Sequence, residues 1–496
     1  MQASNSRAAI FTGSLGHKLA FNTSFLLAGQ VVALAFSIVL NAVLGRLLGA
    51  AEFGTYYLLI ATSTFAFVFV DWGQSLHLIR ESARDPGKDG QRLGGALAFR
   101  ASVVLLAGPA TAVLMRAIGY DGRIEFLALC SVLCGLPLLL SQAYTCMFRG
   151  RDRMDLDAAV TVTAKALTVA VTVPALFLGG GIRTVVLMQA VGGVGALLMA
   201  LFLARRIRLV VRRPDRRTFE DLARGGAPIA AFAIAVTVQP FIDIVVLSRL
   251  VPPEVVGWYG AARNIMGLLF VPASILCSAS FPEFSRVSGS VPDLRRALRT
   301  TLRVLLGIGA LGAVGTMMFA GVVVKIIYGQ GHFDPAVTML RIFAPILPLF
   351  FIGMSFSSAV TAAGKTKELA IAKVLSVAVS TGLNFVVIPI CQARLGNGGI
   401  GLVLDFGASE IVMIFAYLWL LPRGAIDRST ALNILRAAVA AVGTVAIFWV
   451  LPSVTPWIAV PACVAVFIGL ALACGLVLWK DLDTVTDLIR ARLARA

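Results

Sequence analysis

Nine ionisable residues lie inside long apolar stretches of the chain, where a charge is energetically costly. A charged side chain within a membrane usually faces a cavity or an oppositely charged partner. An uncompensated charge of this kind binds a ligand of opposite charge, whereas a compensated one holds helices together. The basic residues are Arg100, Lys165, Arg263, Arg341 and Lys373, and the acidic residues are Asp71, Asp243, Asp405 and Glu410.

The surrounding sequence places these residues in membrane-spanning helices. The chain of 496 residues is 58% hydrophobic and 14% charged, whereas soluble domains carry about 25% charged residues. Apolar runs of about 20 residues recur along the chain, as membrane helices require, without the alternation typical of a membrane β-barrel. We predict an all-α integral membrane protein with about 14 spans. They cover 20–44, 54–78, 94–117, 124–148, 158–178, 184–204, 225–249, 257–281, 301–325, 339–363, 368–391, 399–421, 432–451 and 457–479.

Lysine and arginine set the predicted orientation. With the N-terminus inside, most of the 43 basic residues fall in inner segments and few in outer loops, as the positive-inside rule requires. We therefore expect both termini in the cytoplasm. The basic run RRIRLVVRRPDRR (205–217) lies between two spans, which indicates a linker at the membrane surface rather than a nucleic-acid site.

The five basic residues within spans fall into two groups by their distance from the ends of the spans. Lys165 and Arg263 lie six or seven residues inside their spans, too deep to reach the interface easily, and we expect them to line a cavity. Arg100 and Lys373 lie nearer the inner ends and Arg341 near an outer end. For these three, snorkelling to the interface is the alternative to a cavity.

The four carboxylates within spans have two interpretations. They are either counter-ions for the basic residues or a site where H⁺ or Na⁺ couples to transport. Asp243 is six residues before Arg249, too far along a helix for a direct pair, so it needs another partner or a cavity. Arg80, at the end of the second span, either guards an inner entrance or forms an ion pair with Glu81.

Metal and enzyme chemistry finds little support. The seven cysteines lie in or beside apolar spans and the three histidines are scattered, so we expect no metal site and no cofactor. A phosphate-binding lysine loop and a nucleophile–histidine–carboxylate pattern are both missing from the sequence. We therefore do not expect an enzyme.

A short motif occurs twice in the chain, as VLGRLLGAAEFGTYYL (43–58) and VLSRLVPPEVVGWYGA (246–261). The shift between the copies carries span 1 onto span 7, and an even number of spans separates them, so both keep one orientation. The repeat predicts two six-helix lobes related by an axis along the membrane normal. We expect an N-lobe at 1–204, a basic linker at 205–224, a C-lobe at 225–421, two further spans at 432–479 and an amphipathic tail at 480–496.

Structural roles explain this motif better than a substrate site does. Arg46 and Arg249 fall in the last turns of their helices, where a cation meets the negative end of the helix dipole. Gly49 suits the end of a helix. Tyr56 and Tyr259 are expected in the aromatic belt at the membrane surface.

The repeated motif resembles the opening signature of the polysaccharide transporter family, whose members include O-antigen and oligosaccharide flippases. This family belongs to the multidrug/oligosaccharidyl-lipid/polysaccharide exporter superfamily, and its members have two six-helix lobes plus two further helices. Other stretches are similar to the family in the same order. They are LIRESAR (78–84), FPEFSRV (281–287), IIYGQGHFDPAVTMLRIFAPILP (326–348), TAAGKTKELAIAKVLSVAVSTGLNFVVIP (361–389) and GGIGLVLDFGASEI (398–411).

The resemblance implies a substrate and a mechanism. An oligosaccharide repeat unit on a polyprenyl diphosphate would be flipped from the inner to the outer leaflet of the bacterial cytoplasmic membrane, for surface polysaccharide synthesis. The basic residues within spans would bind the diphosphate in a shielded polar cavity, and the two lobes would rock by alternating access. The implied partners are the lipid-linked glycan, membrane lipids, and a polysaccharide polymerase and glycosyltransferases of the same pathway.

Two alternatives stay open at this point. A multidrug or organic cation extruder of the same superfamily would favour an acidic, aromatic cavity, whereas basic residues outnumber acidic ones within these spans. A membrane glycosyltransferase or polymerase acting on the same lipid would need a large loop for its catalytic groups. The longest outer loops here have about a dozen residues.

Overall fold

The computed structural model describes residues 2–450 and 456–476, and every regular element in these ranges is a helix. Eleven helices are long and apolar enough to cross a membrane, and a bent one adds a twelfth. One of the eleven covers Ala28–Arg84, 57 residues, which rise about 85 Å against a hydrocarbon core of about 30 Å. It therefore holds two spans. Together with the shorter apolar helix α15 (Pro456–Ala473), this confirms an all-helical membrane fold with the expected number of spans.

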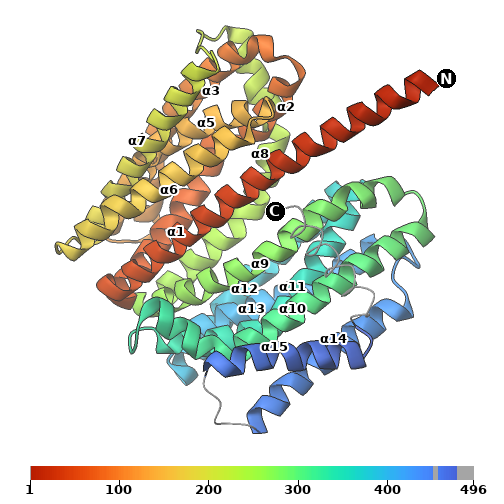
Figure 1. The fold of residues 1–496 in the computed structure, drawn as a ribbon. Coiled ribbons are helices and arrows are strands. Elements are labelled where there is room, and N and C mark those ends of the chain that lie inside the picture. The colour runs from red at the N-terminus through yellow and green to blue at the C-terminus, as the bar shows by residue number, and fades with distance from the viewer. Residues whose placement is uncertain (1, 451–455, 477–496) are drawn as a thin grey trace. The chain divides into compact units, whose positions relative to one another are not determined.

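The chain divides by packing into two compact units, Met1–Val245 and Val246–Ala496. In the first unit α1 lies along α6, α6 packs on α7, and α3 packs on α4 and α5 (Figure 1). The predicted fourth span is broken at Gly135 into α4 and α5. The elements are α1 (Gln2–Asp71), α2 (Gln74–Arg84), the 3₁₀ turn η1 (Pro86–Lys88), α3 (Asp89–Ile118), α4 (Gly122–Cys134), α5 (Leu136–Gly150), α6 (Met154–Phe177), α7 (Ile182–Arg206) and α8 (Arg216–Leu250).

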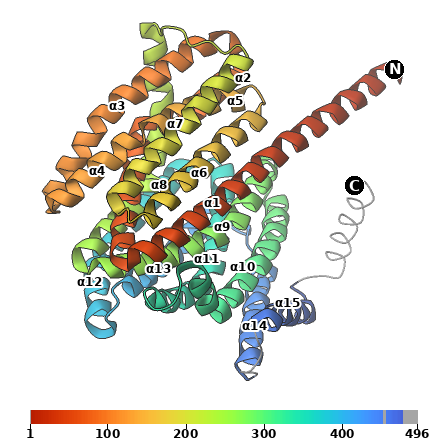
Figure 2. The same ribbon diagram turned by 60° about the vertical axis from the view of Figure 1, so that its left-hand side comes forward.

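The second unit contains the predicted C-lobe spans after the seventh and the last two helices. Helix α10 packs on α11 and α14, and α14 and α15 lie beside it in both views (Figure 2). Buried Leu302, Phe356 and Tyr417 share one core with Cys463 of α15, so the last two helices belong to this unit. Its elements are α9 (Pro253–Val287), α10 (Val291–Tyr328), α11 (Asp334–Ala362), α12 (Thr366–Leu395), α13 (Gly399–Leu420), α14 (Arg428–Val450) and α15. The predicted tail at 480–496 lies outside the described residues.

Each copy of the repeated motif contains a break between two helical segments. In the first copy the helical path of α1 is interrupted at Gly49, with φ 75° and ψ 177°, a conformation that glycine adopts without steric cost. In the second copy α8 ends at Leu250 and α9 begins at Pro253. The prediction that Gly49 ends a helix is confirmed.

The prediction that the two tyrosines of this motif lie in an aromatic belt exposed at the membrane surface is wrong. Tyr56 and Tyr259 are only 7% and 5% exposed. Tyr56 is hydrogen-bonded to Gln189 of α7, and the ring of Tyr259 lies 6.4 Å from that of Phe343 on α11. The rings turn toward neighbouring helices because each has a partner there, and lipid is not their environment.

The predicted linker at 205–224 is fastened to the first unit by hydrogen bonds. The backbone N–H of Arg212 donates to the carbonyl of Gly90 at 2.9 Å, and Trp72 Nε1 donates to the carbonyl of Ala223 at 3.1 Å. These contacts join the linker to α3 and to the end of α1.

Close packing reinforces this attachment. A Cβ added to Gly94 of α3 would lie 2.1 Å from the carbonyl oxygen of Arg212, and one added to Gly73 would lie 2.4 Å from that of Gly226. Packing assigns the linker and α8 up to Val245 to the first unit, beyond the lobe boundary predicted at 204.

The first testable prediction concerns the helix break at Gly49. Gly49→Ala should lower the free energy of unfolding by about 1 kcal/mol, because a side chain is strained at this left-handed φ. Denaturant titration of the purified protein in detergent, followed by circular dichroism, measures the change. Gly267→Ala is the matched control, since a Cβ there meets no atom within 4 Å and alanine favours a helix. Equal stability of the two variants would contradict the prediction.

Candidate functional site

A polar cavity of about 410 Å³ lies within the first unit, between α5 and α6 with Ser75 of α2 at its edge. Its volume is in the range of small-molecule sites. Apolar atoms contribute to its walls, but eight of its twelve lining residues carry hydroxyl, amide or charged groups. The polar lining residues are Ser75, Ser141, Gln142, Thr145, Arg149, Asp157, Thr161 and Lys165.

Two polar stripes line this cavity, one from each helix. Each helix contributes three polar residues spaced four apart, which places them on one helical face. The Nε of Arg149 donates to the Asp157 carboxylate at 2.8 Å and sets the antiparallel register of the helices. In this register Lys165 lies opposite Ser141. The stripes are Ser141, Thr145 and Arg149 on α5, and Asp157, Thr161 and Lys165 on α6.

Lys165 reaches the cavity without a carboxylate partner among the residues that the structure describes. Asp157 lies two turns away on the same helix, about 12 Å along the axis, and is paired with Arg149. Lys165 is an exposed residue and lines the cavity. Lys165 therefore has the surroundings expected of a cation that binds a ligand.

Arg100 is in a different situation, because its charge is compensated inside the protein. The side chain is fully buried. Its Nη2 donates to Asp71 at 2.5 Å and to Ser75 Oγ at 3.0 Å, and its Nη1 donates to the carbonyl of Leu139 at 2.7 Å. Arg100 therefore does not snorkel to the interface, and Asp71 is its counter-ion.

In the second unit, a lysine within a span also has an acidic residue as its electrostatic partner. Lys373 of α12 interacts electrostatically with Glu410 of α13. The carboxylate of Glu410 occupies the space above Gly353 of α11, where an added Cβ would lie within 1.8 Å of its oxygen. An electrostatic interaction between this acid and this base agrees with the counter-ion interpretation.

Asp405 lies in a buried polar seam between α12 and α13. It is 3% exposed, accepts a hydrogen bond from Ser380 and interacts with Asn384. One turn away, Ser376 and Ser409 are 3.2 Å apart. The described residues hold no cluster of three His, Cys, Asp or Glu side chains that would suit a metal ion.

Arg263 of α9 is held by aromatic rings. Its guanidinium carbon lies 5.0 Å from the ring centroid of Phe270 and 5.2 Å from that of Phe406 on α13. It is half-buried. Distances of this size are typical of cation–π contacts.

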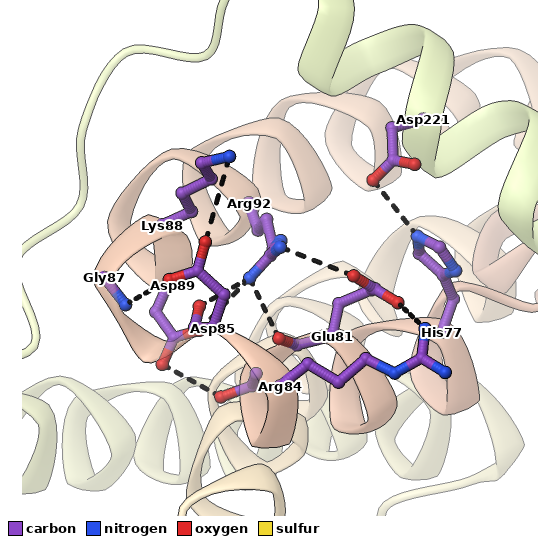
Figure 3. Close-up of polar contacts among 10 residues, drawn as sticks. His77, Glu81, Arg84, Asp85, Gly87, Lys88, Asp89, Arg92 and Asp221 are labelled. Carbon is purple, nitrogen blue, oxygen red and sulfur yellow. Dashed lines mark hydrogen bonds and ion pairs between the residues drawn. The ribbon is translucent and has the colours of Figure 1, made fainter.

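The remaining candidates lie apart from these groups. Arg341 and Arg80 are exposed, and Asp243 is half-buried on α8. Of the two interpretations of Arg80, the ion pair finds no support in the described residues, where Glu81 is engaged by Arg84 at 3.2 Å and by Arg92 at 3.5 Å (Figure 3).

The LIRESAR stretch forms part of an ion network at the junction of α2 and α3 (Figure 3). Asp89 is fully buried, accepts from Ser82 at 2.9 Å and from Arg151 at 2.7 Å, and so ties this junction to the end of α5. Arg92 donates to the carbonyls of Glu81 and Asp85. The network braces the end of the unit and leaves few donors for a ligand.

The sequence analysis missed several residues of these sites. Arg149 and Asp157 had a detectable signal, because the two stripes of polar residues at a spacing of four stand out in apolar helices. Phe270 and Phe406 had none, because phenylalanine is common in any membrane span.

The fold and the polar cavity define a multi-pass membrane transporter. Residues 19–288 match the family model described as "Polysaccharide biosynthesis protein", more than half of the chain, and the protein belongs to this family. A second model, MatE, matches residues 228–389.

Individual relatives agree with this assignment. A Shigella flexneri protein named "Putative O-antigen transporter" is 23% identical over 373 residues, which cover 71% of this chain and 86% of the relative. Among solved structures, the lipid II flippase MurJ in an inward closed conformation has a TM-score of 0.72 at 13% identity and covers 94% of this chain and 100% of its own.

An inward-facing multidrug resistance MATE family transporter of the MOP superfamily has a TM-score of 0.63 at 17% identity, and covers 78% of this chain and 93% of its own. The chain therefore has the fold of these transporters. The expectation of a transporter rather than an enzyme is confirmed.

The buried Arg100–Asp71 pair generates the second prediction. Asp71→Asn should lower the free energy of unfolding by about 3 kcal/mol or more, because it leaves a buried guanidinium uncompensated. Denaturant titration in detergent measures the loss, and Arg100→Gln added to Asp71→Asn should recover part of it.

The control for this prediction is an ion pair at the surface. Arg153 Nε donates to the Asp155 carboxylate at 2.9 Å. Both side chains are partly exposed, so Arg153→Gln should cost less than about 1 kcal/mol. A similar loss in both variants would mean that burial does not distinguish the two pairs.

Proposed function

We propose that this protein flips polyprenyl-diphosphate-linked oligosaccharide repeat units from the inner to the outer leaflet of the bacterial cytoplasmic membrane. The family of polysaccharide biosynthesis proteins supports a glycan substrate, and the name of the Shigella flexneri relative supports its transport. The product would enter the synthesis of a surface polysaccharide, next to the polymerase and glycosyltransferases of that pathway.

The observation that carries this proposal is Lys165 in the polar cavity of the first unit, with no carboxylate partner among residues 2–450 and 456–476. Sugars and phosphates do not cross hydrocarbon unaided, because their polar groups lose their hydrogen bonds to water. The two stripes of α5 and α6 offer replacement donors and acceptors for sugar hydroxyls, and Lys165 offers a cation for an anionic group. The lipid tail needs no such shelter and stays in the bilayer.

The proposal assigns different roles to the other charged residues within spans. Arg263 acts as a second cation for the headgroup. Arg100 and Lys373, which have Asp71 and Glu410 as counter-ions, act structurally. Asp243 and Asp405 are the candidates for coupling transport to H⁺ or Na⁺.

Alternating access completes the mechanism. The two units would rock so that the headgroup enters from one side of the membrane and leaves on the other. The helix α8 connects them, and it is bent by 59° between 231 and 236. Proline residues at positions 228 and 240 flank this bend, and they weaken the helix on both sides of it.

A transport assay tests the function. Purified protein reconstituted in liposomes should move a polyprenyl-diphosphate oligosaccharide between leaflets and leave its glycan unaltered. Chemical modification of the sugar would indicate a glycosyltransferase or polymerase instead. Export of a cationic dye without movement of the lipid would indicate a multidrug extruder.

The third prediction concerns Lys165. Lys165→Ala should lower the initial rate of flipping about tenfold or more, because a charge-assisted contact to the substrate is lost. Lys165→Arg should keep most of the rate. The matched control is Lys325→Ala, which removes an exposed lysine in the last turn of α10 and should flip normally. Full flipping by a correctly inserted Lys165→Ala protein would refute the role of this cavity.

A further inference from the structure

The second unit contains a cation whose charge is held in place but not neutralised. Arg263 is the tenth residue after Pro253, where α9 begins, which places it about 15 Å along the helix and thus deep within a span. Its side chain makes no hydrogen bond or ion pair with any residue that the structure describes, and its contacts with Phe270 and Phe406 are cation–π contacts. Arg100 shows the contrast, since Asp71 compensates its charge.

The aromatic rings are themselves fixed by their neighbours. The centroids of Phe270 and Phe406 are 6.4 Å apart, with ring planes 26° from parallel. Phe350 of α11 stacks on Phe270 at 4.0 Å, and Phe343 meets Phe406 edge-on at 5.9 Å. The ring cluster, Phe270, Phe343, Phe350 and Phe406, therefore spans three packed helices, α9, α11 and α13.

This arrangement has a chemical consequence. A ring face attracts a cation through its quadrupole but carries no net charge, so the guanidinium keeps its full positive charge. The N–H donors of a guanidinium lie in its own plane, and a ring face accepts no conventional hydrogen bond, so contacts with Phe270 and Phe406 leave donors available for another group. A guanidinium edge fits the paired oxygens of a phosphate or a carboxylate.

We propose that Phe270 and Phe406 are positioning residues that hold the guanidinium of Arg263 so that its edge binds an oxyanion of the transported headgroup. The inference rests on the proposed function for the identity of the headgroup. The diphosphate of the lipid is the first source of such an oxyanion, and the carboxylate of an acidic sugar is the second.

Anion binding by the purified full-length protein in detergent at low salt tests the proposal without any transport step. Isothermal titration calorimetry with inorganic diphosphate, and separately with glucuronate, identifies which anion binds. Arg263→Gln should abolish the binding. Phe406→Leu and Phe270→Leu should each weaken it about tenfold, whereas Phe406→Tyr keeps a ring and should restore it.

A matched control and a double mutant separate positioning from a general packing effect. Phe415→Leu removes an exposed ring from α13, the helix that carries Phe406, and it should bind as the wild type does because this ring lies outside the cluster. The weakening by Phe406→Leu should vanish in an Arg263→Lys background, because a lysine ammonium has no planar fork for the rings to orient. An equal further loss in that background would overturn the positioning role.

The outcomes distinguish this inference from the proposed function. Anion binding that depends on Arg263 and Phe406, in a protein that does not flip the lipid-linked glycan, would support the site and refute the function. Normal flipping by Phe406→Leu and Phe270→Leu, together with unchanged anion binding, would refute the inference and leave the function standing. Failure of both anions to bind the wild-type protein would also overturn it.

Discussion

The structure depends on one constraint: a charge placed inside a membrane span must be stabilised by its surroundings there. The protein meets this constraint in three ways. The buried Arg100 has a carboxylate partner, Asp71, Lys165 lines a polar cavity, and Arg263 lies against ring faces. Only the first way neutralises the charge. The surroundings of each cation therefore indicate whether it holds helices together or is available to a ligand.

Lys165 and Arg263, each in its own unit, have different surroundings, which suit different chemical groups. Lys165 stands among hydroxyl and amide groups that match the hydroxyls of a sugar. Arg263 is half-buried beside the rings of Phe270 and Phe406, which offer no hydrogen-bond acceptor to compete with an oxyanion for its donors. A headgroup that joins sugars to a diphosphate contains both kinds of group.

The sequence predicted the helices, the break at Gly49 and the depth of Lys165 and Arg263, because hydrophobic runs and glycine conformation are local properties. It did not predict that Arg100 meets Asp71, since these residues lie on different helices and only the packing of α1 against α3 brings them together. The burial of Tyr56 and Tyr259 was missed for the same reason. The polar stripes on α5 and α6 could be predicted only in part. Their spacing of four residues is visible in the sequence, but the sequence does not show that the two stripes face each other.

The attachment of the linker to the first unit has a consequence for the evolution and engineering of such proteins. The repeat in the sequence begins again with α8, yet Trp72 and Gly73 hold the start of that helix to the first unit. The boundary predicted from the sequence repeat and the boundary set by packing therefore differ by one helix. A chimaera that exchanges halves at residue 204 would pair α8 with a foreign surface at α1 and α3, whereas a junction near Val245 keeps each helix with the neighbours it packs against.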